Sequence, residues 1–499
     1  MLGSSDGSAP KKRSLGMFTP SRSPLELARE RARSLDEAGA RVEFDAPLGR
    51  ALKTTVSLCP DCLAHVPALV VEEAGRVLVR KRCPEHGLKV AVLENDARYY
   101  FLSNKDKSGR VFALDRVFNI PAFPGAGLAG EACCEGGACD STDQTTNKTC
   151  TVLVEVTDAC NLACPVCYSD AKGERQLPRE KFERYIEALI EKKGGLDSVQ
   201  LTGGEALLHP DVFDMVAFLA SHPKVKKVYL PTNGLLLLKE RRAIRLARYR
   251  DKLMVLLQFD GATDDSDRAL RSATPGRTRR EVVRALGDLG IFMQLTMTLA
   301  RGVNDLEVGE VIELALRHEH VKVVALQPAT YSGRYELEPD PLTRLTLSDV
   351  VKAVVRQTRR AREADFVPIP CSHPNCGWIT LFVRRFGVVH NIVRYVDMPR
   401  VLDQVSYRTL LSTAELRGAV GGGSPLKRAI AGVGKRLIRS HDMFTVAIKP
   451  FMDRHSYDQD RVDHCCHHIL DTKGAPLSFC EYNAVLRQRD PWTELPKLT

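Results

Sequence analysis

Three cysteines that follow a short β-branched stretch constrain this chain more than any other feature. Residues 151–168 read TVLVEVTDACNLACPVCY, in which Cys160, Cys164 and Cys167 have the spacing C-x3-C-x2-C. The stretch 152–156 has the composition of a buried strand, so the cysteines are expected in the loop after it. Three thiolates at this spacing can hold three irons of a [4Fe–4S] cube and leave the fourth iron open. The alternative is a three-cysteine zinc site, but structural zinc takes four protein ligands and no close fourth ligand is present.

Length and composition indicate a soluble protein of several domains. The chain has 499 residues, 44% of them hydrophobic and 27% charged, and this length predicts about two to four domains. No uncharged apolar run of about 18 residues occurs, so no membrane span is expected. The first residues lack the apolar segment of a secretory signal, so a cytoplasmic location is expected. The net charge of +10 is mild and the charges are mixed, which predicts no nucleic-acid partner.

The first cysteine group predicts a metal-binding module. Fifteen cysteines in a chain without an export signal are expected to be metal ligands rather than disulfides. Cys59-x2-Cys62 and Cys83-x2-His86 flank a strand-like segment, which is the form of a zinc ribbon or rubredoxin-like site. The histidine favours zinc over a mononuclear iron, and a filled tetrahedron suggests a structural or docking role. A pair of free-thiol turns is the alternative.

Residues 151–330 alternate strand and helix patterns six times. The helix pattern after the first strand has apolar residues at helical spacing from Phe182 to Ile190. This alternation predicts a parallel sheet with right-handed crossovers, as in a partial (β/α)6 barrel. The active site of such a barrel lies at the carboxyl ends of its strands, where the three cysteines are expected. The predicted strands are 152–156, 198–202, 225–230, 252–259, 291–298 and 321–326.

Glycines and polar residues follow the later strands. Gly203, Gly204 and Glu205 come after the second strand; the glycines allow a close approach of the backbone to a ligand, and the carboxylate can accept a hydrogen bond from an ammonium group. The other polar residues at the strand ends are also candidates for contact with a ligand. For each of them, an ordinary loop cap or turn is the alternative. These other candidates are Asn233, Gln258, Asp260, Asn304 and Gln327.

Two further cysteine groups suggest auxiliary clusters. One precedes the first barrel strand and the other lies in the C-terminal region, where four of the five cysteines could close a cluster and one would be spare. Incidental loop cysteines and buried inert thiols are the alternatives. Nearby histidines are possible ligands or proton carriers. The first group is Cys133, Cys134, Cys139 and Cys150; the second is Cys371, Cys376, Cys465, Cys466 and Cys480; the histidines are His373, His464, His467 and His468.

A basic amphipathic pattern covers residues 426–439. Such a helix can lie on an anionic bilayer, which would place the protein peripherally on the inner face of a membrane. Packing on a domain with the charges in solvent is the alternative.

The order of these motifs resembles one branch of the radical S-adenosylmethionine (SAM) superfamily. That branch includes the archaeal tetraether lipid synthases and the class D methylase-like proteins. The motifs are CPxC, CPEHG, EVTDxCNLxCPVCY, CSHPxC and FCEYN, and they run from about Val56 to Asn483. The sequence departs from the branch at Gly136, where members often have a cysteine; Cys133 or Cys134 could substitute.

The resemblance implies a cofactor set and a cradle for SAM. Cys160, Cys164 and Cys167 would hold the [4Fe–4S] cluster, SAM would bind the open iron, and one or two auxiliary [4Fe–4S] clusters are implied. The segment Gly203 to Glu205 matches the family's contact with the SAM amino group. Arg271 matches a position that meets the SAM carboxylate, and the ring of Tyr168 would pack beside the cluster. The candidates at the other strand ends would also contact SAM; they are Asn233, Gln258, Asp260, Asn304 and Gln327.

The chemistry implied is hydrogen abstraction from an unactivated carbon by a 5′-deoxyadenosyl radical, with the electron supplied by a donor such as flavodoxin or ferredoxin. The first hypothesis is carbon–carbon bond formation on lipid alkyl chains. The second is C-methylation of a pterin-like or other small substrate. The third is a non-catalytic iron–sulfur scaffold or electron carrier, which would need no SAM cradle. No catalytic side chain is assigned.

The patterns together predict an α/β protein, a partial radical SAM barrel between two metal-binding regions. The predicted divisions are a tail and helix at 1–50, a ribbon-like module at 51–120, a cysteine-rich segment at 121–150, the barrel at 151–335 and an auxiliary-cluster region at 336–499.

Overall fold

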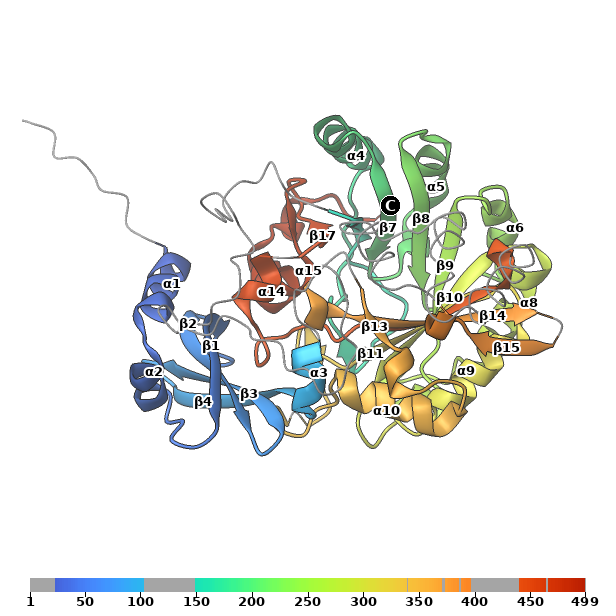
Figure 1. The fold of residues 1–499 in the computed structure, drawn as a ribbon. Helices are drawn as coiled ribbons and strands as arrows, with labels where there is room; N and C mark the ends of the chain where they lie inside the picture. The colour runs from blue at the N-terminus through green and yellow to red at the C-terminus, as the bar shows by residue number, and fades with distance from the viewer. Residues whose placement is uncertain are drawn as a thin grey trace, which may run out of the picture.

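The computed structural model (Figure 1) describes residues 23–102, 149–338, 340–369, 373–385, 387–395, 439–463 and 465–498.

The N-terminal module is a four-stranded antiparallel sheet covered by short helices. Helix α1 (Pro24–Ser34) begins at Ser23, whose side chain and that of Glu26 form a reciprocal capping box. The strands lie in the order β1-β2-β3-β4, and one face buries Phe44, Leu69 and Val71 in a small core. The other elements are α2 (Glu37–Glu43), β1 (Arg50–Leu58), β2 (His65–Glu73), β3 (Arg76–Cys83), β4 (Gly87–Glu94) and α3 (Ala97–Leu102).

Six parallel strands form the centre of the molecule, as the sequence predicts. They lie in the order β11-β10-β9-β8-β7-β5. Their interior positions are filled by β-branched residues and leucines, which is typical of strands buried on both faces. The bounds are β5 (Thr151–Thr157), β7 (Leu196–Gly203), β8 (Val225–Thr232), β9 (Leu253–Gln258), β10 (Phe292–Leu299) and β11 (Val321–Pro328).

Amphipathic helices connect these strands. In the first of them, α4, the side chains of Phe182, Ile186 and Ile190 are buried, and the helix ends at Gly194 in the left-handed conformation. Pro178 precedes its first turn as the cap residue. The helices are α4 (Arg179–Lys193), α5 (Val212–Ser221), α6 (Arg242–Ala247), α7 (Asp264–Arg271), α8 (Gly276–Asp288), α9 (Val308–Arg317) and α10 (Leu347–Thr358).

The C-terminal region extends the same sheet at both edges. Strand β16 (Met443–Ile448) pairs in parallel with β11, and β17 (His467–Leu470) pairs in parallel with β5. The sheet therefore has two more parallel strands than the six of the predicted barrel. The edges are completed by β13 (Val367–Pro368), β14 (Trp378–Arg385), β15 (Val388–Asn391) and β18 (Pro476–Ser478).

Part of the C-terminal region also joins the N-terminal module to the barrel (Figure 1). Lys53 and Thr55 of β1 both bind the buried carboxylate of Asp458, at 2.7 Å each. Lys81 of β3 donates to the backbone carbonyl of His455 at 2.7 Å. These contacts run between residues about 400 positions apart in the chain. The N-terminal module therefore packs directly against the C-terminal region and is not held by the chain connection alone. Helices α14 (Gln459–Asp463) and α15 (Phe479–Glu481) lie in this region.

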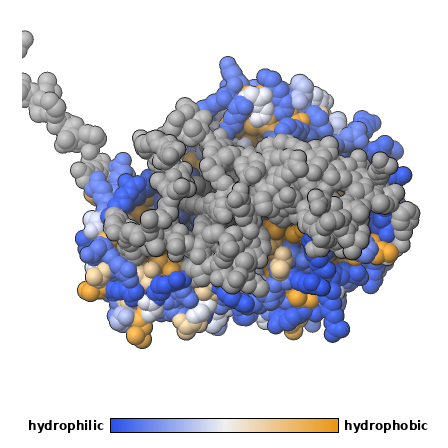
Figure 2. Space-filling view, in the orientation of Figure 1, coloured by the Kyte–Doolittle hydropathy of each residue, from blue (hydrophilic) through white to orange (hydrophobic). Residues whose placement is uncertain are grey.

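The residues that are coloured by hydropathy in Figure 2 are mainly hydrophilic on the face shown. Hydrophobic residues appear there in small separate groups among hydrophilic ones. Among the described residues, no helix has the length and apolar character needed to cross a membrane.

Candidate functional site

The three central cysteines lie together at the carboxyl end of β5. They are free thiols, each partly exposed, in the loop between β5 and α4. Burial raises the pKa of Cys160 to about 11, and the neighbouring Glu205, Cys164 and Cys167 act in the same direction. The three thiols are therefore within electrostatic reach of one another, on the face of the barrel where the sequence predicts them. A donor set of three neighbouring thiols fits the open-iron cluster.

Two glycines let the end of β7 lie directly against this loop. A Cβ atom on Gly203 would lie 2.1 Å from the carbonyl oxygen of Thr157, and Gly203 has a φ of +127°. A Cβ atom on Gly204 would lie 1.9 Å from the carbonyl oxygen of Ala159. No other residue fits either position, because real Cβ atoms do not approach so closely. The glycines thus fix the backbone just before Cys160.

Glu205 is buried behind the loop. Its carboxylate accepts hydrogen bonds from the backbone N–H of Asn233 at 2.9 Å and of Leu207 at 3.3 Å. Burial raises the pKa of Glu205. The side chain of Asn233 donates to Asn161 at 2.7 Å, so the ends of β7 and β8 are both joined to the cysteine loop.

An ion pair stands beside Cys164. Arg271 makes two hydrogen bonds, of 2.7 and 2.8 Å, to the fully buried carboxylate of Asp260, and its charge is within electrostatic reach of the thiol of Cys164. Burial would raise the pKa of Asp260, but the guanidinium of Arg271 holds it below its usual range. A second buried guanidinium, of Arg279, lies 3.6 Å from Asp260. The positive charge is suited to stabilising a thiolate.

The other predicted strand-end residues serve mainly local contacts. Gln258 donates to Asp260 at 2.6 Å. Asn304 is buried and uses its amide to bind the backbone carbonyls of Asp260 and Thr298 and the N–H of Ala300, as the loop-cap alternative describes. Gln327 lies opposite Thr298 in the β10–β11 register. A contact of these residues with SAM stays a prediction.

Tyr168 packs against the C-terminal region. Its ring meets that of Phe479 edge to face, with 5.2 Å between the centroids. Burial raises its pKa to about 12, so the phenol is neutral. The ring is thereby fixed next to Cys167.

The residues 331–335 also contact the cysteine loop, which the sequence patterns did not reveal. Strand β12 (Arg334–Tyr335) pairs with β6 (Val166–Cys167). Gly333 has a φ of +62°, and a Cβ atom on it would lie 2.4 Å from the carbonyl oxygen of Cys167. The isolated glycine after β11 was the only sequence signal for this close approach.

The four predicted ribbon ligands form a compact site. The ligand atoms of Cys59, Cys62, Cys83 and His86 all lie within 4.8 Å of one another. The Cys62 and Cys83 sulfurs are 3.8 Å apart, and Nδ1 of His86 lies 3.4 Å from the sulfur of Cys83. Metal bonds of about 2.3 Å to sulfur and 2.0 Å to nitrogen give tetrahedral edges of about 3.5 to 3.8 Å. The geometry therefore fits zinc.

The C-terminal cysteines divide into two places. Cys376, Cys465 and Cys480 influence one another electrostatically and lie near the guanidinium of Arg461. Burial raises the pKa of Cys480 to about 12. Cys371 lies outside the described residues. This trio is the part of the predicted auxiliary site that the structure brings together.

Cys466 instead lies beside Cys150. The two side chains share a small buried cluster with Ile369, and the N–H of Cys150 donates to the carbonyl of Cys466 at 2.8 Å. Because β5 and β17 are neighbours, the residues just before them meet. Cys133, Cys134 and Cys139, predicted with Cys150, lie outside the described residues.

The candidate histidines have other surroundings. His373 pairs with Asp460 at 3.4 Å, His467 packs on the rings of Phe451 and Phe479, and His468 hydrogen-bonds Thr149 at 2.7 Å. His464 and residues 426–438 of the basic amphipathic segment lie outside the described residues.

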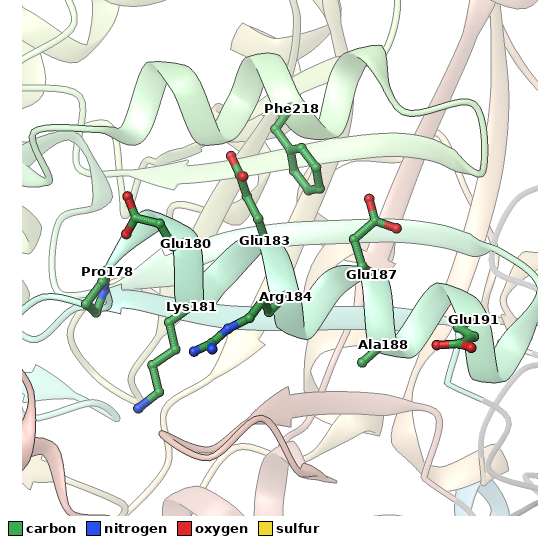
Figure 3. Close-up of a pocket in the computed structure, with 9 residues that line it drawn as sticks. All are labelled: Pro178, Glu180, Lys181, Glu183, Arg184, Glu187, Ala188, Glu191 and Phe218. Atoms are coloured by element: carbon green, nitrogen blue, oxygen red, sulfur yellow. The ribbon is translucent and has the colours of Figure 1, made fainter.

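A shallow groove on the outside of the barrel carries none of the candidate residues. It is formed by α4 together with Phe218 of α5. In Figure 3 the side chains of Glu180, Glu183 and Glu187 point towards α5, and that of Lys181 points away from it. The groove is thus separate from the cysteine loop.

Two family models match this chain. Residues 154–315 match the radical SAM superfamily, and residues 51–95 match the HMPTM N-terminal zinc ribbon domain. The first match includes the three cysteines, and the second includes all four ribbon ligands.

Curated relatives extend the similarity. A 7,8-dihydro-6-hydroxymethylpterin dimethyltransferase of Methanocaldococcus jannaschii is 27% identical over 492 residues, which cover 87% of this chain and 94% of the relative. A GTP 3′,8-cyclase of Aquifex aeolicus is 27% identical over 48% of this chain and 74% of its own. The GTP 3′,8-cyclase of Listeria monocytogenes is 24% identical, and the match spans about half of its length, 55%.

Solved structures overlap less completely. SuiB of Streptococcus suis, bound to its precursor peptide SuiA, covers 60% of this chain and 68% of its own, with 12% identity and a TM-score of 0.37. A radical SAM methyltransferase from Sphaerobacter thermophilus covers 65% of this chain and 79% of its own, with 15% identity and a TM-score of 0.33.

Proposed function

Because this chain is a radical SAM enzyme with an N-terminal zinc ribbon, we propose that it methylates a carbon atom of a pterin-like small molecule. The observation that carries the proposal is the similarity to the Methanocaldococcus jannaschii dimethyltransferase, which runs through 94% of that protein. The similarity therefore includes the regions on both sides of the barrel, where substrate differences among such enzymes are expected.

The residues at the barrel mouth have distinct tasks in this proposal. Cys160, Cys164 and Cys167 hold the [4Fe–4S] cluster, and the carboxylate and backbone around Glu205 receive the amino end of SAM. When bound, the cluster and SAM supply the radical that removes hydrogen from an unactivated carbon. Arg271 places its positive charge near Cys164, and Asp260 keeps the guanidinium in place. Gln258, Asn304 and Gln327 are proposed to contact SAM.

The Cys376, Cys465 and Cys480 trio is proposed to hold an auxiliary cluster, and the four ribbon ligands a structural zinc. A small reductant protein such as flavodoxin or ferredoxin is the proposed electron donor. These assignments follow from the donor types and their proximity.

Carbon–carbon coupling of lipid chains, the first hypothesis from the sequence, stays a prediction. It is motivated by the resemblance to the branch that includes tetraether lipid synthases and by the segment 426–439, of which residues 426–438 lie outside the described residues. The non-catalytic scaffold is set aside, because the match to the radical SAM family makes the chain an enzyme.

The test is anaerobic turnover with a labelled methyl group. Reconstituted protein is incubated with a reductant, 6-hydroxymethyl-7,8-dihydropterin and SAM that carries a deuterated methyl group, and in a second incubation with unlabelled SAM and a deuterated methylene donor. Mass spectrometry is expected to find a labelled, methylated pterin together with 5′-deoxyadenosine. Deoxyadenosine with an unlabelled pterin in both incubations would contradict the proposal, and coupled chains in a parallel incubation with phospholipid would favour the lipid hypothesis.

A further inference from the structure

Positive charge is concentrated in the segment that contains α6. Residues 239–252 include seven lysines and arginines and two acidic residues, which leaves five of the chain's ten net positive charges in this segment. One of the acidic residues, Glu240, is already paired with Arg242 at 2.9 Å. Within the described parts of the chain, four exposed cations of the segment form no ion pair. These cations are Lys239, Arg241, Arg245 and Arg248.

Three of these cations follow one another along the exposed side of α6. The backbone N–H of Arg245 donates to the carbonyl of Arg241 at 3.0 Å, so Arg241 lies one turn before Arg245, and Arg248 follows after three residues. Two aliphatic side chains, of Leu238 and Ile244, are 42% and 47% exposed in the same segment. We call the exposed side chains of residues 238–248 the α6 surface. A few apolar groups among arginines are typical of a surface that contacts another protein.

The α6 surface adjoins the cysteine loop. This loop is exposed at Asn161 and Ala163, between the first and second cluster cysteines. The side chain of Asn233, at the end of β8, donates to Asn161 at 2.7 Å. Leu238 follows Asn233 by five residues, which span at most ~18 Å. A partner on the α6 surface would therefore lie next to the exposed part of the cysteine loop.

Side-chain contacts fix the α6 surface relative to that loop. Arg242 donates to the backbone carbonyl of Leu207 at 2.6 Å, two residues after Glu205. The guanidinium of Arg245 lies over the ring of Phe213, 3.7 Å from its centre, where α6 lies beside α5 (Figure 1). A partner would thus be held at a constant distance from the cysteine loop.

The chemistry of the chain indicates which partner belongs there. The proposed function requires one electron for each SAM that is cleaved, and the donor of that electron is another molecule. Opposite charges on two proteins accelerate their encounter, and contacts between electron-transfer proteins are small, as is a surface built on one short helix. A nucleic acid would find the cations but no counterpart for Leu238 and Ile244.

We propose that the α6 surface is the docking site of an acidic one-electron carrier protein. In the step that it serves, the carrier is oxidised by one electron and the cluster, when bound, is reduced by one; no bond or proton changes at the contact. The inference rests on the proposed function only through its need for an electron, and it identifies where the donor binds.

Binding of an acidic flavodoxin tests the assignment. Reconstituted full-length protein is titrated anaerobically with oxidised flavodoxin, and the dissociation constant is measured by calorimetry. A double variant with Arg241→Gln and Arg248→Gln is expected to raise this constant about tenfold, because two charges of the docking surface are lost. Added salt should weaken binding to the wild type more than to the variant.

The matched control carries the same loss of charge on another helix. It is a double variant with Arg356→Gln and Arg359→Gln, of which Arg356 lies on α10 and Arg359 directly after it. Both arginines are exposed, and Arg359 has the same left-handed backbone conformation as Arg241. The dissociation constant of this control is expected to equal that of the wild type.

Deoxyadenosine formation separates docking from chemistry. With dithionite, a small reductant that needs no docking surface, the α6 double variant should cleave SAM at the wild-type rate, which also shows that it has folded. With limiting reduced flavodoxin its rate should fall about tenfold, as the loss of affinity predicts.

Equal dissociation constants in the two double variants would overturn the inference, as would a wild-type protein that does not bind flavodoxin. Binding of anionic vesicles or single-stranded DNA to the α6 surface, without binding of flavodoxin, would also overturn it. Flavodoxin-dependent cleavage of SAM without a methylated pterin would contradict the proposed function alone. Methylation of the pterin with equal affinities in the two double variants would contradict this inference alone.

Discussion

The Asp260–Arg271 pair is the residue-scale feature with the largest energetic consequence. Both side chains are buried, at 0% and 8% exposure, and the charge of Arg271 is within electrostatic reach of Cys164. A buried charge that loses its partner destabilises a protein strongly, whereas an exposed pair contributes little. The pair therefore affects both the fold and the cluster.

Asp260→Asn is expected to lower the free energy of unfolding by ~3–5 kcal/mol, because Arg271 is left without its carboxylate. The rate of deoxyadenosine formation should fall as well, since the guanidinium of Arg271 is no longer held in place near the cysteine loop. Denaturant unfolding and a timed SAM-cleavage assay measure the two effects. Asp265→Asn, which removes an exposed pair with Arg268, is the control, and equal stability of the two variants would argue against this role.

Gly204 gives a second residue-scale prediction. In Gly204→Ala the new methyl group would displace the loop at Ala159, so the protein should lose the cluster next to Cys160, about four irons. Gly287→Ala is the matched control, because a Cβ atom there meets nothing closer than 3.7 Å. The iron content per protein is measured after reconstitution. A wild-type iron content in Gly204→Ala would contradict the close contact between Gly204 and Ala159.

At the scale of elements, β4 is attached to α10 through a buried acid. Glu94 accepts hydrogen bonds from the hydroxyls of Thr346 and Ser348. Burial raises its pKa to about 7, above its value in an unfolded chain. Between pH 4.5 and 7 the folded protein therefore binds more protons than the unfolded chain, and the stability falls as pH rises through this range.

Glu94→Gln should remove this pH dependence, worth up to ~3 kcal/mol. The melting temperature of the variant, relative to the wild type, is expected to be higher at pH 8 than at pH 5. Glu319→Gln, with an 82% exposed side chain, should show no such change. A constant difference between Glu94→Gln and the wild type at both pH values would show that Glu94 titrates normally.

The barrel strands were predictable because their signal is local. Each predicted strand agrees with the observed bounds within two residues, since β-branched runs between amphipathic helices leave little ambiguity. The strands β16 and β17 were not predicted, because four to six residues that pair with distant strands give no local pattern. The proximity of Cys466 to Cys150 depends on the position of β17, so the sequence pattern did not predict it either.

The site was predictable only in part. The spacing of Cys160, Cys164 and Cys167 and the Gly-Gly-Glu segment identified the cysteine loop and its neighbour. The hydrogen bonds that occupy Asn304, and the contact of Gly333 with Cys167, depend on how separate loops meet in space. The predicted division of the chain into five segments stays a prediction.

At the scale of the whole molecule, the zinc site and the cluster lie in separate elements. The ribbon ligands are on the β1–β2 and β3–β4 turns, and the cluster cysteines are at the end of β5. Cys62→Ser should therefore lose about one zinc and keep the irons of the cluster. Metal analysis after anaerobic reconstitution measures both, and a parallel loss of about four irons would show that the sites are not independent.

Reductive cleavage of SAM tests the central claim most directly. The wild-type protein, reconstituted anaerobically and reduced, should convert SAM to 5′-deoxyadenosine and methionine in equal amounts. Cys164→Ala should retain its zinc and form no deoxyadenosine. Deoxyadenosine formation by Cys164→Ala at the wild-type rate, or none by the fully reconstituted wild type, would contradict the account.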